Sequence, residues 1–166
     1  FGGKADIELG IIRAVGDPHQ RFAEDALRIL RACRFSAELG YAVEPCTYQG
    51  MLENKGLLSK ISAERVTHEL QKLVLGPHAG DALLACVDAL SAVLPELVAM
   101  KGFDQQTPYH IFDVLEHTAR VVDGVPPYPL VRWAALFHDM GKPACFFKDE
   151  NGTGHFYGHA GVSVPI

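Results

Sequence analysis

The chain has 166 residues, of which 48% are apolar and 21% charged, a balance typical of one or two small globular domains. No apolar run is long enough to span a membrane and no signal-peptide pattern is present, so we expect a cytoplasmic protein without membrane association. The formal net charge of −5 argues against a broadly basic nucleic-acid surface and permits only a local basic patch.

The chain begins with Phe1 rather than Met, which we interpret as an internal piece of a longer protein. Its cysteines lie far apart, with no C-x-x-C spacing: Cys33, Cys46, Cys86 and Cys145. This pattern predicts reduced thiols rather than disulfides or a zinc knuckle.

The first half of the chain predicts an extended entry followed by helices. Residues 1–15 are apolar with β-branched side chains and predict a short strand, and Gly16-Asp17-Pro18 marks a turn. A single helix is then expected from Pro18 to Leu39, with Gly40 as its stop. Its apolar stripe recurs at helical spacing and consists of Ala26, Leu30, Cys33 and Ala37.

Helices are predicted for the rest of the chain as well. Ser62 is a good N-cap for a helix over Ala63–Leu75, and another helix is expected from Gly80 to Leu94. A polar stretch at 101–108 predicts a domain boundary. Two more helices are expected, over Tyr109–Val122 and Pro129–Met140. The predicted fold class is therefore all-α, with domains at 1–100 and 101–166.

The most informative segment, Arg21–Phe35, contains an acid and a base at helical spacing. If the segment is helical, Asp25 and Arg28 lie side by side. Cytosine and adenine each present a ring-nitrogen acceptor beside an amino donor, whereas uracil and guanine present the reverse. An Asp–Arg pair would therefore accept C and A and reject U and G. The alternative is an ordinary surface ion pair, worth about 0.2–0.5 kcal/mol.

The same segment resembles a nucleotide-recognition motif. Glu24-Asp25-Ala26-Leu27-Arg28 is similar to the E-D-x-x-R motif of the bacterial tRNA nucleotidyltransferases and poly(A) polymerases, and the flanking G-D-P-x-x-R-F and R-I-L-R-A-x-R-F also match. The resemblance implies a parent enzyme that adds C, C and A to tRNA from CTP and ATP. It implies that Asp25 and Arg28 contact the base and that Arg21 and Glu24 brace them. Arg31 or Arg34 would meet phosphate or a neighbouring domain.

A second candidate site is formed by histidines near the C-terminal end. His138-Asp139 lies in an apolar predicted helix, where a buried carboxylate costs several kcal/mol unless a charge such as a divalent cation neutralises it. Together with His117, this pair resembles the HD superfamily of metal-dependent phosphohydrolases. The resemblance implies that His117, His138 and Asp139 bind a metal of unspecified identity. It implies that His155 and His159 serve a second metal or the phosphate.

Two departures from these families limit what the chain is expected to do. HD families complete the site with a further Asp on a later helix, and no such residue follows here, so we expect an incomplete metal site. The transferase reaction needs paired carboxylates holding Mg²⁺ and a Gly-Ser turn, and the sequence contains no D-x-D and no Gly-Ser. We therefore expect no catalytic residues for nucleotide transfer in this chain.

Three other interpretations remain open. A poly(A) polymerase of the same family shares these motifs and would use ATP alone. An HD-type phosphohydrolase would use the N-terminal helices only as a scaffold. A helical RNA-binding module without catalysis is disfavoured by the acidic charge balance.

Overall fold

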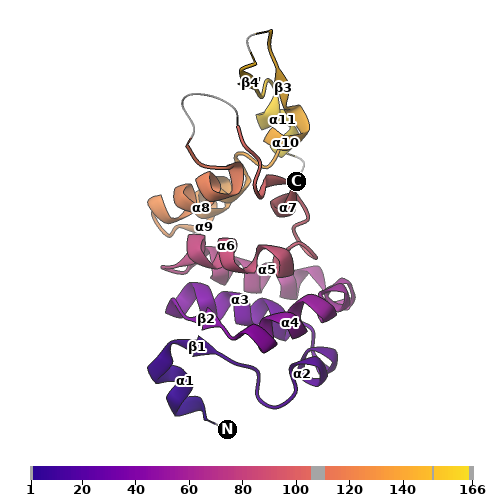
Figure 1. The fold of residues 1–166 in the computed structure, drawn as a ribbon, viewed down its shortest axis with the longest axis vertical. Helices are drawn as coiled ribbons and strands as arrows, with labels where there is room; N and C mark the ends of the chain where they lie inside the picture. Colours follow the sequence, from indigo (N-terminus) through magenta and orange to yellow (C-terminus); the bar gives the residue numbers. More distant parts are fainter. Residues whose placement is uncertain (1, 106–110, 151, 165–166) are drawn as a thin grey trace.

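The computed structural model describes residues 2–105, 111–150 and 152–164 and confirms the all-α prediction. Figure 1 shows helices stacked in successive layers, from the N-terminal helix at one end to a small hairpin at the other. None of the described helices is both long and apolar enough to cross a membrane. The described cysteines are all free thiols.

The helices and strands follow one another in the order shown in Figure 1. The α-helices are α1 (Gly3–Leu9), α2 (Pro18–Glu24), α3 (Leu27–Leu39), α4 (Pro45–Asn54), α5 (Ala63–Leu75), α6 (Ala79–Leu90), α7 (Glu96–Met100), α8 (Val114–Gly124), α9 (Pro129–Phe137), α10 (Lys142–Cys145) and α11 (His159–Ser163). A 3₁₀-helix, η1, covers Lys55–Lys60. The strands are β1 (Ile11–Ile12), β2 (Ala42–Val43), β3 (Phe147–Lys148) and β4 (Gly154–His155).

The N-terminal entry is only partly extended. Strand β1 exists and pairs in parallel with β2, but the preceding Gly3–Leu9 segment is helical, so the prediction for this part of 1–15 was wrong. Helix α1 ends where Gly10 adopts a left-handed conformation (φ 66°) and its N–H bonds back to the carbonyls of Asp6 and Ile7. Helix α1 buries none of its side chains, so its apolar residues do not mark a strand that faces the core.

The expected single helix over Pro18–Leu39 is two helices with a break at Asp25. The backbone of Asp25 is extended (φ −151°, ψ 100°), and its Oδ1 accepts a hydrogen bond from Leu27 N at 3.1 Å. A short acidic side chain can bond to the backbone in this way and so competes with the helical pattern. The prediction of one continuous helix was therefore wrong, but Arg28 N still donates to the Asp25 carbonyl at 3.1 Å, so the two residues lie within one turn of each other.

Helix α3 forms the centre of the hydrophobic core. It packs against α5 on one side and α6 on another, and the predicted stripe is buried, with Ala26, Leu30, Cys33 and Ala37 each no more than 5% exposed. The Ala63–Leu75 helix begins and ends as predicted. Helix α6 ends at Leu90, before the predicted Leu94, and residues 91–93 form turns.

Helices α6 and α8 approach closely at Gly80. The N–H of Gly80 donates to Asp123 Oδ1 at 2.8 Å, and a Cβ added at Gly80 would lie 2.6 Å from the carbonyl oxygen of Ala119. This contact joins the first half of the chain to the helices that carry the histidines. The expected division into domains at residue 100 is not decided by these contacts and stays a prediction.

We expect Gly80→Ala to lower the free energy of unfolding by about 1–3 kcal/mol, because the added methyl group would force α6 and α8 apart. Denaturant unfolding followed by circular dichroism measures the change. Gly56→Ala is the control, since a Cβ there meets no atom within 4 Å. Equal stability of the two variants would contradict the tight contact.

Two predicted helices in the second half begin or end differently. Helix α8 begins at Val114, where the Asp113 side chain caps it by accepting from Glu116 N at 2.7 Å. Residues 109–110 of the predicted helix lie outside the described residues. Helix α9 runs from Pro129 to Phe137, so His138 and Asp139 follow its end instead of lying within it.

Candidate functional site

The break between α2 and α3 brings three charged side chains together. Glu24, the last residue of α2, accepts hydrogen bonds from Arg21 Nη1 at 2.9 Å and from Arg28 Nη1 at 2.7 Å. These bonds, the one from Arg28 foremost, lower the pKa of Glu24. Arg28 Nη1 also donates to the Arg21 carbonyl at 2.9 Å. Glu24 thus joins the two arginines, while the expected role of Arg21 and Glu24 in bracing a base-contacting pair stays a prediction.

Asp25 has different partners from Arg28. Its Oδ1 accepts from Leu27 N, and its Oδ2 lies 3.6 Å from Arg65 Nη2 on α5. Arg34 is turned inward, with Nε 3.0 Å from Glu69 Oε2 and its side chain only 12% exposed. The structure therefore leaves Arg34 poorly placed to meet phosphate.

A cavity of about 370 Å³ lies beside the Arg21–Glu24–Arg28 group. Arginines and aromatic rings supply much of its lining, which includes Arg13, Arg21, Phe22, Arg28, Arg31 and Phe35. Three of these arginines were expected at a nucleotide site, and Arg13 was missed. Arg13 comes to the cavity because β1 pairs with β2, a contact between distant segments that local sequence patterns do not reveal.

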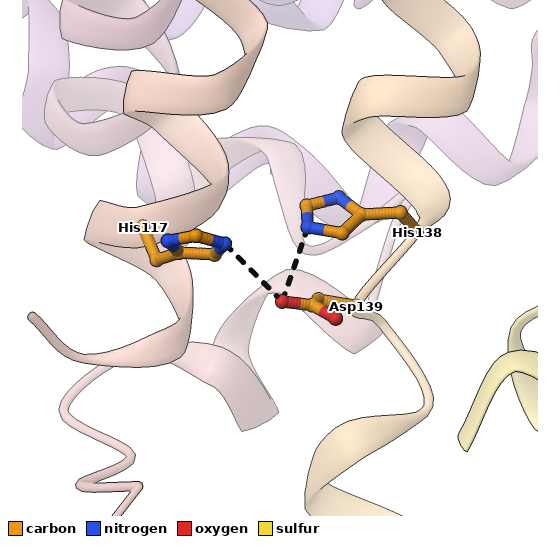
Figure 2. A group of neighbouring side chains, drawn as sticks. All are labelled: His117, His138 and Asp139. Atoms are coloured by element: carbon orange, nitrogen blue, oxygen red, sulfur yellow. Dashed lines mark ion pairs between the residues drawn. The ribbon is translucent and has the colours of Figure 1, made fainter. Parts of the chain in front are cut away.

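The histidine cluster forms around one carboxylate oxygen. Figure 2 shows His117 from α8 and His138 from the end of α9 both pointing at Asp139, with His117 Nε2 3.5 Å and His138 Nε2 3.1 Å from Asp139 Oδ2. Ligand atoms of all three residues lie within 4.8 Å of one another. Among the described residues, these three form the group that could hold a metal ion.

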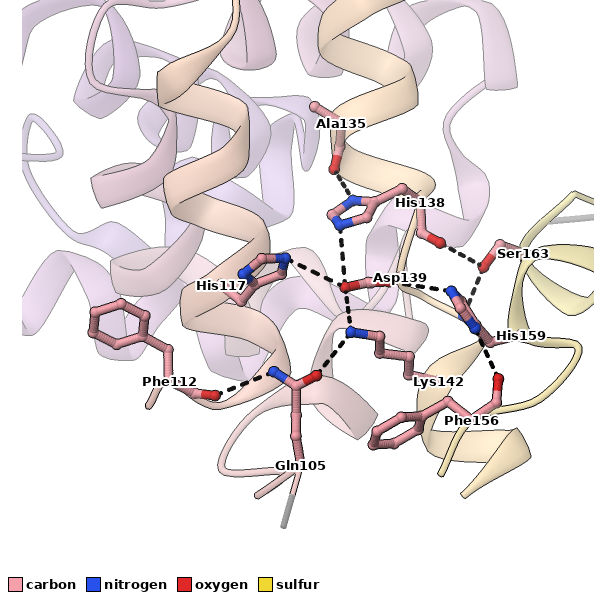
Figure 3. A network of polar contacts seen from close by, with 11 residues as sticks. Gln105, Phe112, His117, Ala135, His138, Asp139, Lys142, Phe156, His159 and Ser163 are labelled. Atoms are coloured by element: carbon pink, nitrogen blue, oxygen red, sulfur yellow. Dashed lines mark hydrogen bonds and ion pairs between the residues drawn. The ribbon is translucent and has the colours of Figure 1, made fainter. Parts of the chain in front are cut away.

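Lys142 also points at this carboxylate, a contact that the sequence analysis missed. Its Nζ lies 2.8 Å from Asp139 Oδ2 and donates to Gln105 Oε1 at 2.7 Å, as Figure 3 shows. Burial raises the pKa of Asp139, but the interactions with His138 and Lys142 outweigh it and lower that pKa to about 2. The hydrogen bond to Asp139 in turn raises the pKa of His138. The Gly-Lys pair after His-Asp was the available sequence signal.

The three residues suit a divalent cation. Asp139 Oδ2 is buried and lies between the two imidazoles, 3.5 Å from His117 Nε2 and 3.1 Å from His138 Nε2. His138 Nδ1 lies 2.7 Å from the Ala135 carbonyl and can donate to it, leaving Nε2 free to bind a metal. Two imidazoles and a carboxylate suit Mn²⁺, Fe²⁺ or Zn²⁺. A metal bound to Oδ2 would have to share or replace the contact with Lys142.

The other two predicted histidines are placed differently. His159 Nε2 lies 3.5 Å from Asp139 Oδ1, on the other oxygen of the same carboxylate, and its Nδ1 lies 2.8 Å from the Phe156 carbonyl. His155 instead pairs with Asp149, its Nε2 2.9 Å from Oδ2, within the β3–β4 hairpin. The structure therefore brings His159 to the cluster and pairs His155 with Asp149 instead. Their roles toward a second metal or a phosphate stay predictions.

Known proteins are similar to this chain over most of its length. The family described as "Probable RNA and SrmB- binding site of polymerase A" matches residues 40–101. The CCA-adding enzyme of Bacillus velezensis is 35% identical over 147 residues, which cover 85% of this chain and 33% of that enzyme. The chain belongs to the family of bacterial tRNA nucleotidyltransferases and poly(A) polymerases.

Further relatives of the same family support this assignment. The CCA-adding enzyme of Geobacillus stearothermophilus is 50% identical over 98 residues, covering 58% of this chain and 24% of that enzyme. A solved structure, the Bacillus stearothermophilus CCA-adding enzyme in complex with CTP, superposes with a TM-score of 0.61 and 37% identity. That match covers 86% of this chain and 35% of the other. The chain spans 24–35% of the length of these relatives.

Proposed function

We propose that this chain is the base-recognition part of a tRNA nucleotidyltransferase that adds C, C and A to tRNA 3′ ends from CTP and ATP. The observation that carries the proposal is the Arg21–Glu24–Arg28 group beside an arginine-lined cavity. The likeness to an enzyme whose structure holds CTP supports it. The Mg²⁺-binding carboxylates for transfer would lie elsewhere in the longer protein, which would act in the cytoplasm.

Arg28 is held so that part of its guanidinium can read a base. Glu24 and the Arg21 carbonyl both bind Nη1, and the other nitrogens remain able to donate to the ring nitrogen and carbonyl of cytosine or to the ring nitrogen of adenine. A planar guanidinium fixed in this way suits recognition of a planar edge. The Asp25 carboxylate would accept from the amino group of either base, and Arg31 would contact phosphate.

We expect Arg28→Ala to weaken binding of CTP and ATP alike by about 10- to 150-fold, the value of one or two hydrogen bonds from a charged group. Isothermal titration calorimetry on this chain measures it, with UTP and GTP as ligands that should bind weakly to the unaltered protein. Arg120→Ala, a surface arginine paired with Glu116, is the control. Unchanged CTP and ATP affinities in Arg28→Ala would refute the role of Arg28.

Incorporation of labelled nucleotides into tRNA distinguishes a CCA-adding enzyme from a poly(A) polymerase. The longer protein that contains this chain should add C, C and then A to tRNA lacking its 3′ end. Long A tails without C would assign it to the poly(A) polymerases instead.

A second function is favoured by the histidine cluster. Residues 101–166 would form a partial HD domain in which His117, His138 and Asp139 hold a divalent metal. Residues 1–100 would form the helical neck and body of the transferase, which contain the nucleotide-recognition segment. When bound, such a metal lowers the pKa of a water molecule and orients it toward a phosphoester. Lys142 and His159, both in contact with Asp139, would meet the phosphate. Metal-dependent phosphate release that requires Asp139 would establish this activity.

A further inference from the structure

The segment between β1 and α2 forms one wall of the arginine-lined cavity. Its residues Ala14 and Val15 line that cavity together with Arg21 and Arg28. The segment belongs to no helix or strand, so its backbone groups must find partners elsewhere in the protein. One hydrogen bond ties it to α4 and another ties it to α2.

The bond to α4 is made by the side chain of Thr47. Ala14 N donates to Thr47 Oγ1 at 3.0 Å, and Thr47 is only 1% exposed. The Thr47 hydroxyl and backbone N–H both donate to Glu44 Oε2, at 2.9 and 2.7 Å, and the backbone bond foremost lowers the pKa of Glu44. An ionised carboxylate only accepts, so the Thr47 O–H points to Glu44 and its lone pairs remain for Ala14 N.

The bond to α2 continues the series toward Arg28. The Val15 carbonyl accepts from Arg21 Nε at 2.9 Å. The Arg21 carbonyl accepts in turn from Arg28 Nη1 at 2.9 Å. The Arg28 side chain is 40% exposed, so packing does little to fix it and these hydrogen bonds decide where it lies. A series of contacts therefore runs from the buried Thr47 hydroxyl to the exposed Arg28 guanidinium.

We propose that Thr47 is a positioning residue, which sets where the Arg28 guanidinium meets the base. It acts through the backbone of Ala14 and Val15 rather than by contact with the nucleotide. A guanidinium free to shift can also donate to the carbonyls of uracil, so the placement of Arg28 decides selectivity as well as affinity. This inference rests on the proposed function and deepens it, because recognition of C and A then depends on a hydroxyl of α4.

The test replaces the Thr47 hydroxyl by a methyl group. Thr47→Val should weaken CTP and ATP binding about 3- to 10-fold, the value of one neutral hydrogen bond, and lower the preference for CTP over UTP by a similar factor. Isothermal titration calorimetry on the whole chain measures both, in EDTA so that the histidine cluster is free of metal. Thr47→Ser keeps the hydroxyl and should retain affinity and preference. Thr118→Val is the matched control, since Thr118 is a buried threonine of α8 outside the cavity lining.

A double variant tests whether Thr47 acts through Arg21. Arg21→Lys keeps the positive charge but removes the Nε–H that binds Val15. Adding Thr47→Val to Arg21→Lys should then weaken CTP binding by less than about 2-fold, because the two changes break the same series of contacts. Losses that simply multiply would overturn the series.

The outcomes separate this inference from the proposed function. If the unaltered chain binds CTP and ATP and Thr47→Val binds them equally well, the inference is overturned and the proposed function stands. If the unaltered chain binds neither nucleotide, the proposed function fails and the inference fails with it. A lower Tm for Thr47→Val with an unchanged preference for CTP would assign Thr47 to packing alone. Thr47→Ala, which also lacks the hydroxyl, takes the place of Thr47→Val if circular dichroism shows that variant to be unfolded.

Discussion

Asp139→Asn is expected to lower the free energy of unfolding by about 3–5 kcal/mol, because it leaves the Lys142 ammonium buried without its charged partner. Asp139 is 3% exposed and Lys142 7% exposed, and their charged atoms lie 2.8 Å apart. The other close contact of Lys142 Nζ is the neutral amide oxygen of Gln105, which cannot balance a charge. Urea unfolding at neutral pH measures the difference.

The double variant Asp139→Asn with Lys142→Met tests the reason for this loss. Removing both charges should recover most of the stability, since an apolar side chain of similar length can occupy the lysine site. Glu116→Gln is the matched control, because the Glu116–Arg120 pair is on the surface and should be worth less than about 1 kcal/mol. If the single and double variants are equally unstable, the ion pair is not what Asp139 contributes.

His138→Ala is expected to weaken Mn²⁺ binding by more than about 100-fold, because it removes one of the three proposed ligands. Loss of a residue that only hydrogen-bonds to a ligand typically costs about 10–100-fold. Calorimetric titration of the chain with Mn²⁺ alone gives the affinity. His155→Ala is the control: it removes a histidine of the same hairpin region that pairs with Asp149 outside the group.

Either of two results would contradict this assignment. Unchanged affinity in His138→Ala would show that Mn²⁺ binds elsewhere. A similar loss in His155→Ala would show that His155 belongs to the metal site, as the resemblance to the HD superfamily implies. Circular dichroism on each variant confirms that the helices are retained.

The sequence predicted those features that depend on neighbouring residues. The Ala63–Leu75 helix was predicted correctly at both ends, although the Ser62 side chain makes no capping hydrogen bond. His138 and Asp139 were singled out because a buried carboxylate needs a compensating charge, and His117 because of the resemblance to the HD superfamily; their role as metal ligands stays a prediction. The stripe along α3 was found because burial at helical spacing follows directly from helix geometry.

The features that were missed depend on backbone bonding or on distant contacts. The break at Asp25 arises because one side chain bonds to Leu27 N, and periodicity continues across it without a signal. Arg13 reaches the cavity only through the pairing of β1 with β2. The contact of Lys142 with Asp139 requires the turn after α9, which the predicted helix through Met140 did not contain.

The Lys142–Asp139 pair has a consequence for how this part of the protein is assembled. In small metal-dependent domains, ligand side chains repel or remain hydrated until an ion arrives, so the apo chain is unfolded. Here the buried Lys142 ammonium already lies 2.8 Å from the buried carboxylate of Asp139. If the proposed metal binds, this part of the chain would therefore fold before the ion arrives and would stay folded when the ion is exchanged.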